Sequence, residues 1–219
     1  MKLALFSDTH ATHGRINIPD ADILIFAGDM THCRTAQDVA NFNNFLGSLP
    51  HTHKIVIGGN HDHRLARDPE KAKALLTNAI YLQDASVVVS GITIYGAPWQ
   101  PTFNDYACDA FALPRGKALQ EKWDMIPPGI DILVTHAPPL GIFDLDGPVS
   151  HGCAELAAAV ARLKPKYHIF GHIHSNHGMV TIGPTRYINC NVQGENGVLR
   201  SALLLDYDSG ELLEAESTG

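Results

Sequence analysis

The chain has 219 residues, 45% hydrophobic and 18% charged, a balance typical of one globular domain spanning residues 1–219. Its formal net charge of −7 argues against an extended nucleic acid as a partner, because an acidic surface repels a phosphate backbone. The sequence has no apolar stretch long enough to cross a membrane, and the apolar run before Ser7 is too short for a signal peptide. We therefore expect a cytoplasmic protein with no membrane partner, whose oligomeric state the sequence does not determine.

Short apolar runs predict buried strands, and helical patterns lie between several of them. The expected strands are residues 3–6, 23–27, 54–57, 92–95, 130–134, 167–170, 186–190 and 201–205. Four helices are expected. The first follows Thr35 and extends to Leu49, and the second runs from Asp68-Pro69 through Leu76. The third has Leu119, Trp123 and Ile126 on one face, and the fourth has Leu156, Val160 and Leu163 on one face and ends at Lys164-Pro165. Strand and helix alternate first and strands dominate the end, which predicts a mixed α/β fold with two sheets packed between helices.

Residues 96–116 are rich in glycine, proline and aromatic residues and show no clear periodicity. We expect a long loop there, and long loops beside strand ends often line a site. Trp99 and Phe103 in this loop could stack on a nucleobase or could only pack the loop onto the domain.

Five of the expected strands run directly into side chains that can bind a metal ion. These side chains are Asp8, His10, Asp29, Asn60, His136, His172 and His174. Ligand sites in open α/β sheets form beyond the carboxyl ends of the strands, so we expect the seven side chains to converge in one crevice. Carboxylate, imidazole and amide-oxygen ligands suit manganese, iron or zinc. Glycines at positions 28, 58, 59 and 171 are expected to let the backbone turn sharply at these ends.

The spacing of the ligands favours a pair of metal ions. Asp8 and His10 lie two positions apart, as do His172 and His174, so an extended segment points both members of each pair the same way. Two metal ions about 3.5–4 Å apart would clamp a phosphate and activate a bridging water, whose hydroxide would attack phosphorus in line. One carboxylate must then bridge the metals, and Asp29 is the expected bridge.

These blocks, in this order, resemble the calcineurin-like metallophosphoesterase superfamily, whose pattern is D-x-H, G-D, G-N-H-[D/E], H and G-H-x-H. The stretches HKIVIGGNHD, IYGAPWQP, DILVTHAPPLG and KPKYHIFGHIH further resemble the metallophosphoesterase-domain-containing family, a group similar to class III cyclic-nucleotide phosphodiesterases. The resemblance implies an α/β fold of four layers, an α/β/β/α sandwich of two mixed β-sheets flanked by helices. It also implies phosphodiester hydrolysis with manganese as a common activator.

The resemblance also assigns roles to individual residues. It implies one metal site made by Asp8, His10, Asp29 and His174, and a second made by Asp29, Asn60, His136 and His172. His61 would stabilise charge at the phosphate or protonate the leaving oxygen, and Asp62 would orient His61 through the far ring nitrogen. The Ser/Thr protein phosphatases of the superfamily carry an arginine where this chain has Cys33, which argues against protein-phosphatase activity.

The sequence therefore predicts a hydrolase of small phosphodiesters, cyclic nucleotides included, that uses two metal ions, with manganese favoured over iron and zinc. Two alternatives stay open: a phosphomonoesterase that acts on a small metabolite, and a non-catalytic scaffold with this fold. The expected partner is a small phosphorylated molecule such as a nucleotide.

Overall fold

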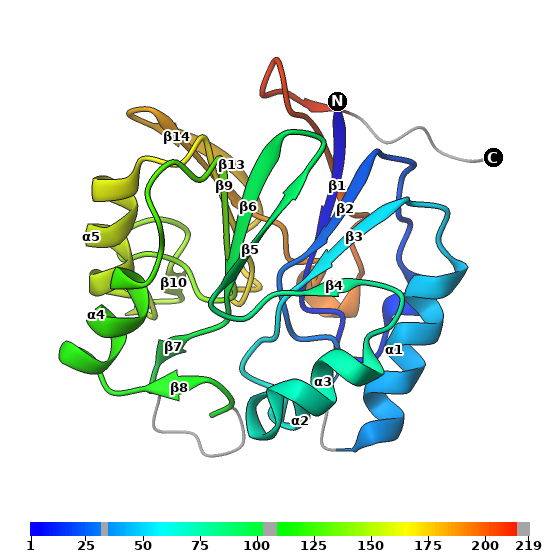
Figure 1. Ribbon diagram of the computed structural model, residues 1–219. Coiled ribbons are helices and arrows are strands. Elements are labelled where there is room, and N and C mark those ends of the chain that lie inside the picture. Colours follow the sequence, from blue (N-terminus) through cyan, green and yellow to red (C-terminus); the bar gives the residue numbers. More distant parts are fainter. Residues whose placement is uncertain (32–34, 103–108, 214–219) are drawn as a thin grey trace.

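Two six-stranded sheets pack face to face in this computed structural model, which describes residues 1–31, 35–102 and 109–213 (Figure 1). The first sheet contains, in spatial order, β16 (Leu212–Leu213), β15 (Leu203–Asp206), β1 (Lys2–Phe6), β2 (Ile23–Phe26), β3 (His53–Val56) and β4 (Ile80–Tyr81). Strands β1 to β4 are parallel, whereas β15 is antiparallel to both of its neighbours, so the sheet is mixed.

The second sheet is also mixed. It contains, in spatial order, β13 (Gly178–Ile182), β14 (Thr185–Asn189), β12 (Tyr167–Phe170), β9 (Ile132–Thr135), β6 (Ile92–Ala97) and β5 (Ala85–Val89). Its four inner strands are parallel, and the edge strands β13 and β5 are antiparallel to them. Two small two-stranded sheets pair β7 (Gln100–Pro101) with β8 (Ala112–Leu113) and β10 (Leu145–Asp146) with β11 (Val149–Ser150).

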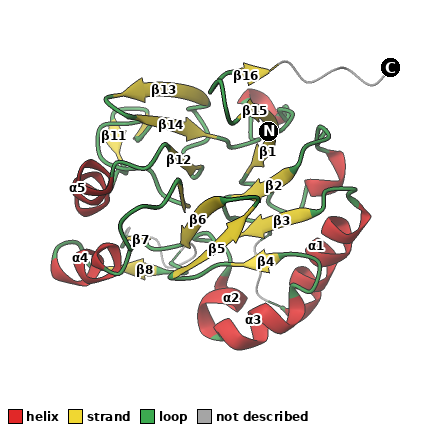
Figure 2. Ribbon diagram, turned by 45° about the horizontal axis from the view of Figure 1, so that its top comes forward, coloured by secondary structure: helices red, strands yellow, loops and turns green. Residues whose placement is uncertain are grey.

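Helices cover the outer face of each sheet, which completes four layers (Figure 2). The helices beside the first sheet are α1 (Ala36–Ser48), α2 (His63–Arg67) and α3 (Pro69–Leu75). Those beside the second sheet are α4 (Lys117–Asp124) and α5 (Ala154–Leu163). The predicted sandwich of two mixed sheets flanked by helices is confirmed. The part of the chain that the structure describes contains no helix long and apolar enough to cross a membrane.

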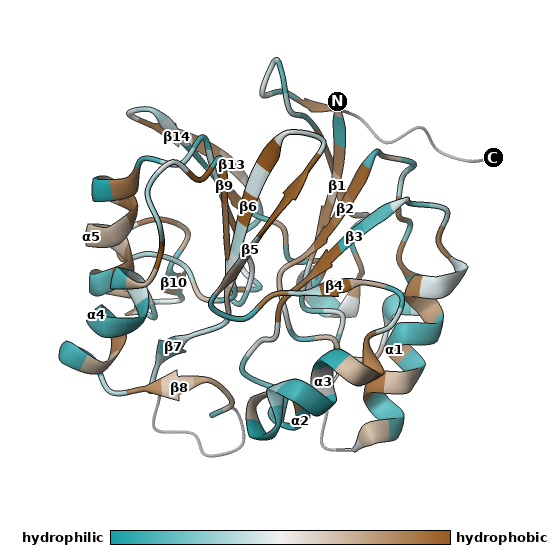
Figure 3. Ribbon diagram, in the orientation of Figure 1, coloured by the Kyte–Doolittle hydropathy of each residue, from teal (hydrophilic) through white to brown (hydrophobic). Residues whose placement is uncertain are grey.

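The inner strands are apolar at consecutive positions because each sheet lies between two layers of side chains. In β1, Leu3 and Leu5 pack in the layer between the sheets, whereas Ala4 and Phe6 pack against the helices of the first sheet. In β9, Ile132 packs between the sheets. The neighbouring Leu133 packs against α4 and α5. The brown, hydrophobic colour along β1, β2 and β9 in Figure 3 reflects this burial.

All eight expected strands are present, with ends shifted by at most two residues. The strands that the sequence did not predict include β5 and β13, which lie at a sheet edge, where one side of the ladder has no partner strand. In β5 half-buried and exposed residues alternate up to the buried Val89, and β13 is half-buried and then exposed, so neither strand is buried on both faces as an inner strand is. The prediction of a long loop over residues 96–116 was partly wrong, because β6 extends to Ala97 and β7 pairs with β8 within that range.

The predicted helix ends are explained by capping. Thr35 accepts a hydrogen bond from the main-chain N–H of Asp38 at 3.2 Å, and the Asp38 carboxylate accepts one from Thr35 N–H at 3.0 Å. This reciprocal pair is a capping box, and it starts α1 where the sequence predicted. Lys164, in the left-handed conformation, ends α5 just before Pro165 as expected. Helix α4 ends at Asp124, so Ile126 packs in the core from beyond the helix.

Candidate metal centre

The carboxyl ends of β1, β2 and β3 meet those of β9 and β12 at one edge of the sandwich. Main-chain hydrogen bonds join loops within each sheet, from Asp8 N–H to Gly28 O at 2.9 Å and from Gly171 N–H to His136 O at 3.0 Å. The two sheets are joined where His172 N–H donates to Asp8 Oδ2 at 3.0 Å. The structure therefore brings together predicted ligands from three strand ends of one sheet and two of the other.

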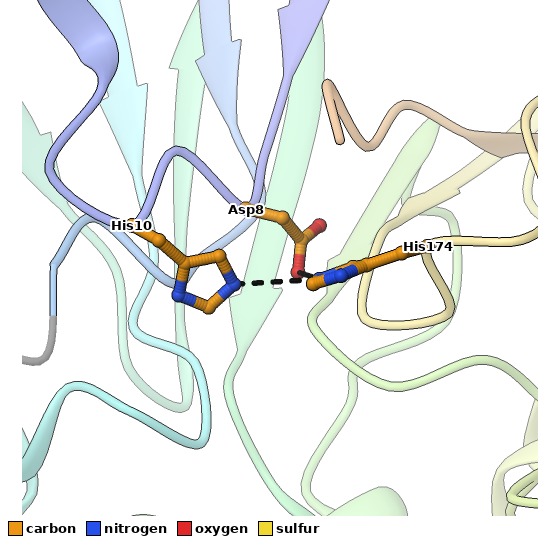
Figure 4. Close-up of side chains that lie close together, drawn as sticks. All are labelled: Asp8, His10 and His174. Atoms are coloured by element: carbon orange, nitrogen blue, oxygen red, sulfur yellow. Dashed lines mark hydrogen bonds and ion pairs between the residues drawn. The ribbon is translucent and has the colours of Figure 1, made fainter. Parts of the chain in front are cut away.

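Asp8, His10 and His174 form one group of donors (Figure 4). The Nε2 atoms of His10 and His174 lie 3.3 Å apart, and His174 Nε2 lies 3.4 Å from Asp8 Oδ1. Asp8 is completely buried, and Ser7 Oγ donates to its other oxygen at 2.5 Å. Two imidazole nitrogens that face each other beside a buried carboxylate are arranged to share a cation.

A second group contains Asp29, Asn60, His136 and His172. Asn60 Oδ1 lies 2.7 Å from His136 Nε2 and 2.9 Å from His172 Nδ1. Asp29 Oδ2 lies 3.3 Å from His136 Nε2 and 3.8 Å from His10 Nε2, so this carboxylate faces both groups. The Nδ1 of His136 lies 2.9 Å from Ala27 O, and since a carbonyl only accepts, Nδ1 carries the proton and Nε2 faces the other donors.

The two buried carboxylates of the centre, Asp8 and Asp29, carry the negative charge that a cation site needs. Burial raises the pKa of Asp8, but the hydrogen bond from His174 and the charge of His136 outweigh it and hold the pKa below its usual value. Burial likewise raises the pKa of Asp29, and the charge and hydrogen bond of His136 reverse this effect. Both carboxylates are therefore ionised at neutral pH.

His136 and His172 differ in charge. Burial lowers the pKa of His136, but the charge and hydrogen bond of Asp29 raise it to about 9. Burial, and then the charge of His136, lower the pKa of His172 to about 3. His136 thus supplies a positive charge between the two carboxylates, and a metal ion bound there would replace its Nε2 proton and supply that charge instead.

Several of the predicted ligands have an uncommon backbone conformation. Asp8, His10, Asp29 and His172 have φ values of 58°, 41°, 63° and 70°, in the left-handed region. Residues other than glycine adopt this conformation at a cost of about 1–3 kcal/mol each, and such residues cluster at functional sites. The surrounding hydrogen bonds hold the ligands in these conformations.

The glycines beside the predicted ligands allow side chains of other loops to approach the main chain closely. Only Gly28 of the four that the sequence analysis named has a positive φ, at 98°. A Cβ on Gly171 would overlap Ser7 Oγ and Asp8 Oδ2, and a Cβ on Gly59 would overlap Asp29 Oδ1. The chain does turn at Gly59 and Gly171, where Asp62 N–H donates to Gly59 O at 3.0 Å and Ile173 N–H donates to Gly171 O at 2.8 Å. Neither turn needs a left-handed glycine, so what requires glycine there is the space that side chains of other loops occupy.

His61 lies at the edge of the centre, where its ring makes an edge contact with that of His10 at 4.8 Å between centroids. Its main-chain N–H donates to Asp29 Oδ1 at 2.9 Å, and its Nε2 lies 4.0 Å from Asp29 Oδ2. The side chain is 21% exposed, against 2% for Asp29. His61 is thus placed between the buried donors and solvent, and its action on substrate stays a prediction.

Asp62 does not make the predicted contact with the far ring nitrogen of His61. Its Oδ2 accepts hydrogen bonds from the main-chain N–H groups of Gly59 at 2.8 Å, Asp29 at 2.9 Å and Met30 at 3.4 Å. Burial and the charge of Asp29 raise the pKa of Asp62 to about 8. The carboxyl group therefore holds together the two loops that carry Asp29 and Asn60, a role that depends on contacts between loops and not on the adjacent residue.

The aromatic side chains of the predicted loop have structural contacts. Trp99 donates from Nε1 to Asp84 at 2.6 Å, stacks under Lys122 Nζ at 3.9 Å and packs against Phe111. These contacts favour the packing role that was one of its two interpretations. Phe103 lies outside the described residues, as does Cys33, on which the argument against a protein phosphatase rests.

His151 is a neighbour of the centre that was not among the residues singled out from the sequence. Its ring lies 6.3 Å from the ring of His172, centroid to centroid. It follows β11, and its main-chain N–H donates to Asp144 O at 2.8 Å. The sequence around His151 does not indicate that it lies beside His172, because the loop has no periodic pattern. The β10–β11 hairpin brings His151 to this place.

The donor set fits a divalent metal of the manganese, iron or zinc type, because it consists of ionised carboxylates, imidazoles and one amide oxygen. Three overlapping groups have ligand atoms within 4.8 Å of one another: Asp8 with His10 and His174, His10 with Asp29 and His61, and Asp8 with Asp29 and His136. The charge, geometry and burial of these groups all suit a cation.

The sequence model of the calcineurin-like phosphoesterase family matches residues 1–176, a range that contains every predicted site residue. The chain belongs to this family. Metallophosphoesterase domain-containing protein 1 of Homo sapiens is 44% identical to it over 212 residues. That alignment covers 85% of the chain and 64% of the human protein, so the chain spans less than two thirds of this relative's length.

Solved structures support the fold of this calcineurin-like phosphoesterase. The structure of the protein TT1561 from Thermus thermophilus has a TM-score of 0.63 at 16% identity and covers 97% of this chain and 96% of that one. A structure described as a novel archaeal phosphodiesterase has a TM-score of 0.50 at 15% identity, over 97% of this chain and 98% of that one. At these identities the likeness shows a shared fold.

Proposed function

We propose that this chain is a metal-dependent phosphodiesterase that acts on small phosphodiesters and binds two metal ions. The observation that carries the proposal is the convergence of two donor groups on one carboxylate. Asp29 Oδ2 lies 3.8 Å from His10 Nε2 in the first group and 3.3 Å from His136 Nε2 in the second. This position supports Asp29 as the ligand shared by both metals.

The donors divide between the two ions. Asp8, His10, Asp29 and His174 would hold one ion, and Asp29, Asn60, His136 and His172 would hold the other. Manganese is the proposed metal, with iron and zinc as alternatives, because the donors are oxygen and imidazole nitrogen without a thiolate. When bound, such ions supply polarisation of a phosphoryl oxygen and a water that is more acidic than bulk water.

The chain's own residues supply position and proton transfer. Asp8 and Asp29 hold the cations, and their burial keeps water from screening these charges. His61 borders both the buried donors and solvent, so a leaving oxygen seated over the centre would lie within reach of its ring N–H. Asp62 fixes the backbone of the two loops that place Asp29 and Asn60.

The open side of the centre favours a diester over a monoester. His10, His61 and His174 have side chains that are 15%, 21% and 45% exposed, whereas those of Asp8 and His136 are fully buried. A phosphate over the buried donors would therefore have exposed groups around it on several sides. This exposure supports a diester, because a second ester substituent needs room beyond the buried donors.

Paired rates on two substrates test the proposal. Purified protein loaded with Mn²⁺ should hydrolyse bis-p-nitrophenyl phosphate faster than p-nitrophenyl phosphate, by kcat/KM. A higher kcat/KM on the monoester would replace the proposal by a phosphomonoesterase. Hydrolysis of neither substrate with Mn²⁺, Fe²⁺ or Zn²⁺ bound to folded protein would contradict an enzyme of this class.

A substitution separates an enzyme from a scaffold with the same fold. Asp29→Asn should lower the rate of diester hydrolysis at least about 100-fold, because it removes the shared negative charge. Asp22→Asn is the matched control, since Asp22 is exposed and its carboxylate accepts a hydrogen bond from Lys2 N–H at the other end of the strands.

Two further statements stay predictions from the sequence. The substrate is expected to be a small phosphorylated molecule such as a nucleotide, and the location is expected to be cytoplasmic.

A further inference from the structure

The loop of residues 171–176 carries His172 and His174, and its main-chain carbonyl groups point toward side chains from the C-terminal part of the chain. Asn189 Nδ2 donates to Ile173 O at 3.1 Å and to Gly171 O at 3.4 Å. Asn191 Nδ2 donates to Ile173 O at 3.2 Å and also to Asn176 O. Arg200 Nη1 donates to His174 O at 3.3 Å. We call Asn189, Asn191 and Arg200 the carbonyl clamp.

The hydrogen bonds within the carbonyl clamp determine which way each side chain points. Asn189 Oδ1 accepts from the main-chain N–H of Asn191 at 3.1 Å, so the other end of the Asn189 amide, Nδ2, must face the loop. Asn191 Oδ1 accepts from Arg200 Nη1 at 3.0 Å, which directs Asn191 Nδ2 toward the loop in the same way. Both asparagine residues are fully buried, so water does not compete for these donors.

The segment of residues 189–200, which carries the carbonyl clamp, also contacts the main chain at Asp8, in the other sheet. Gln193 Nε2 donates to Asp8 O at 2.8 Å. Arg200 Nη1 in turn donates to Gln193 O. The main chain at Asp8 and the main chain at His174 are therefore tied to one segment, although these two ligands come from different sheets. Their side chains lie 3.4 Å apart, between Asp8 Oδ1 and His174 Nε2.

A clamp at this loop is needed because the loop has little regular structure of its own. His172 has a φ of 70°, and the segment between β12 and β13 lies outside helix and strand. A strained residue persists only where its surroundings hold it. The family's sequence model matches residues 1–176, so the ligands lie inside the matched region and the clamp lies beyond it.

We propose that Asn189, Asn191 and Arg200 are positioning residues that set the metal affinity of the loop carrying His172 and His174. This proposal rests on the proposed function only in that it needs the metal centre. Groups that orient metal ligands from behind typically change metal affinity about 10- to 100-fold when they are removed. Arg200 donates to the main chain of His174 and, through Gln193, is tied to Asp8, and both residues belong to the same proposed metal site. Asn189 instead donates to the main chain on both sides of His172, a ligand of the other proposed site.

The test measures Mn²⁺ binding without substrate, by calorimetric titration and by the paramagnetic resonance signal of unbound Mn²⁺. Arg200→Ala should weaken one Mn²⁺ site about 10-fold or more and leave the other within about threefold. Arg200→Lys, which can still donate to His174 O, should recover part of that loss. Asn189→Ala should weaken both sites.

Two control variants separate positioning from general stability. Arg162→Ala removes a guanidinium that donates to Trp123 O at 3.1 Å on the opposite, helical face. Asn43→Ala removes a buried amide that accepts from Asn78 N–H at 2.8 Å. Both controls should bind Mn²⁺ like the wild type even where they lower the melting temperature.

Equal Mn²⁺ affinity of wild type, Arg200→Ala and Asn189→Ala in folded protein would overturn the proposal and leave the proposed function untouched. Wild-type protein that binds Mn²⁺ but hydrolyses no ester would contradict the proposed function, and the affinities of the variants would still decide the role of the clamp. Wild-type protein that binds no Mn²⁺ would overturn both.

Discussion

The Nε2 atoms of His10 and His174 lie 3.3 Å apart, although 164 positions separate the two residues in the sequence. The same His174 atom lies 3.4 Å from Asp8 Oδ1, so three donors from two sheets meet at one point. The two sheets must therefore be docked in their native arrangement before this group of donors exists. Metal binding at this point should in turn stabilise the docking of the two sheets.

His174→Ala should remove one of the two proposed metal ions, because its imidazole completes the group with Asp8 and His10. We expect the Mn²⁺ content of the purified protein to fall from two ions to about one per chain, and diester hydrolysis to fall at least about 100-fold. Elemental analysis and steady-state rates measure both effects.

His53→Ala serves as the control for this substitution, since His53 lies at the start of β3, at the other end of the strand from the centre. It should keep the wild-type metal content. A full complement of two ions in His174→Ala would contradict the assignment of His174 as a ligand.

Gly171→Ala should disrupt the centre without removing any ligand. The added Cβ would overlap Ser7 Oγ and Asp8 Oδ2, so Asp8 or the loop of residues 171–176 would have to move. We expect weaker Mn²⁺ binding by at least about 10-fold and a lower free energy of unfolding by about 1–3 kcal/mol, the usual cost of overpacking.

Gly14→Ala is the matched control, because a Cβ at Gly14 would meet no atom within 4 Å. Its metal affinity and unfolding free energy should stay near those of the wild type. Equal Mn²⁺ affinity of Gly171→Ala and Gly14→Ala would contradict the expected overlap at Gly171.

Asp62→Ala should destabilise the metal-free protein by about 3 kcal/mol or more, because it leaves the buried N–H groups of Gly59 and Asp29 without their acceptor. Asp62→Asn keeps one oxygen that can accept the same hydrogen bonds, so it should lose less. Chemical denaturation of the two variants, followed by fluorescence, measures the difference.

The order of these two variants tests the role that the structure gives to Asp62. If Asp62 acted by orienting the His61 ring, both variants would lose activity alike and keep their stability. A smaller loss of stability in Asp62→Ala than in Asp62→Asn would contradict the hydrogen-bonding role.

The buried His168 should make the free energy of unfolding depend on pH. Burial lowers the pKa of His168 to about 3, below the value of about 6.5 for an unfolded chain. The unfolded state therefore binds the extra proton between about pH 6.5 and pH 3, and the folded state does not. Relative to His168→Gln, the wild type should lose about 1.4 kcal/mol of unfolding free energy per pH unit as the pH falls through this window.

Thr135→Val provides the control, because His168 Nε2 lies 2.9 Å from Thr135 Oγ1 and this variant removes the hydrogen bond while keeping the imidazole. It should lower the unfolding free energy by a similar amount at every pH. A difference between wild type and His168→Gln that stays constant from pH 7 to pH 4.5 would contradict the expected pKa.

The inner strands were predictable from the sequence because each is buried on both faces, and burial on both faces produces a continuous apolar run such as Leu3 to Phe6. The edge strands β5 and β13 were not predicted, because their apolar runs, residues 87–89 and 179–180, are shorter than that of an inner strand such as β1. The capping box at Thr35 was readable because all its atoms lie within one turn of helix.

The sequence by itself determined which side chains follow the inner strands, and hence the proposed metal ligands Asp8, Asp29 and His172 among others, because a strand end is a local property. The tertiary structure alone decided that Asp62 holds the Asp29 loop instead of His61. It alone placed His151 beside His172 and Arg200 beside His174 O. These contacts join segments distant in the chain, and their geometry depends on how two sheets pack, which no local pattern of residues records.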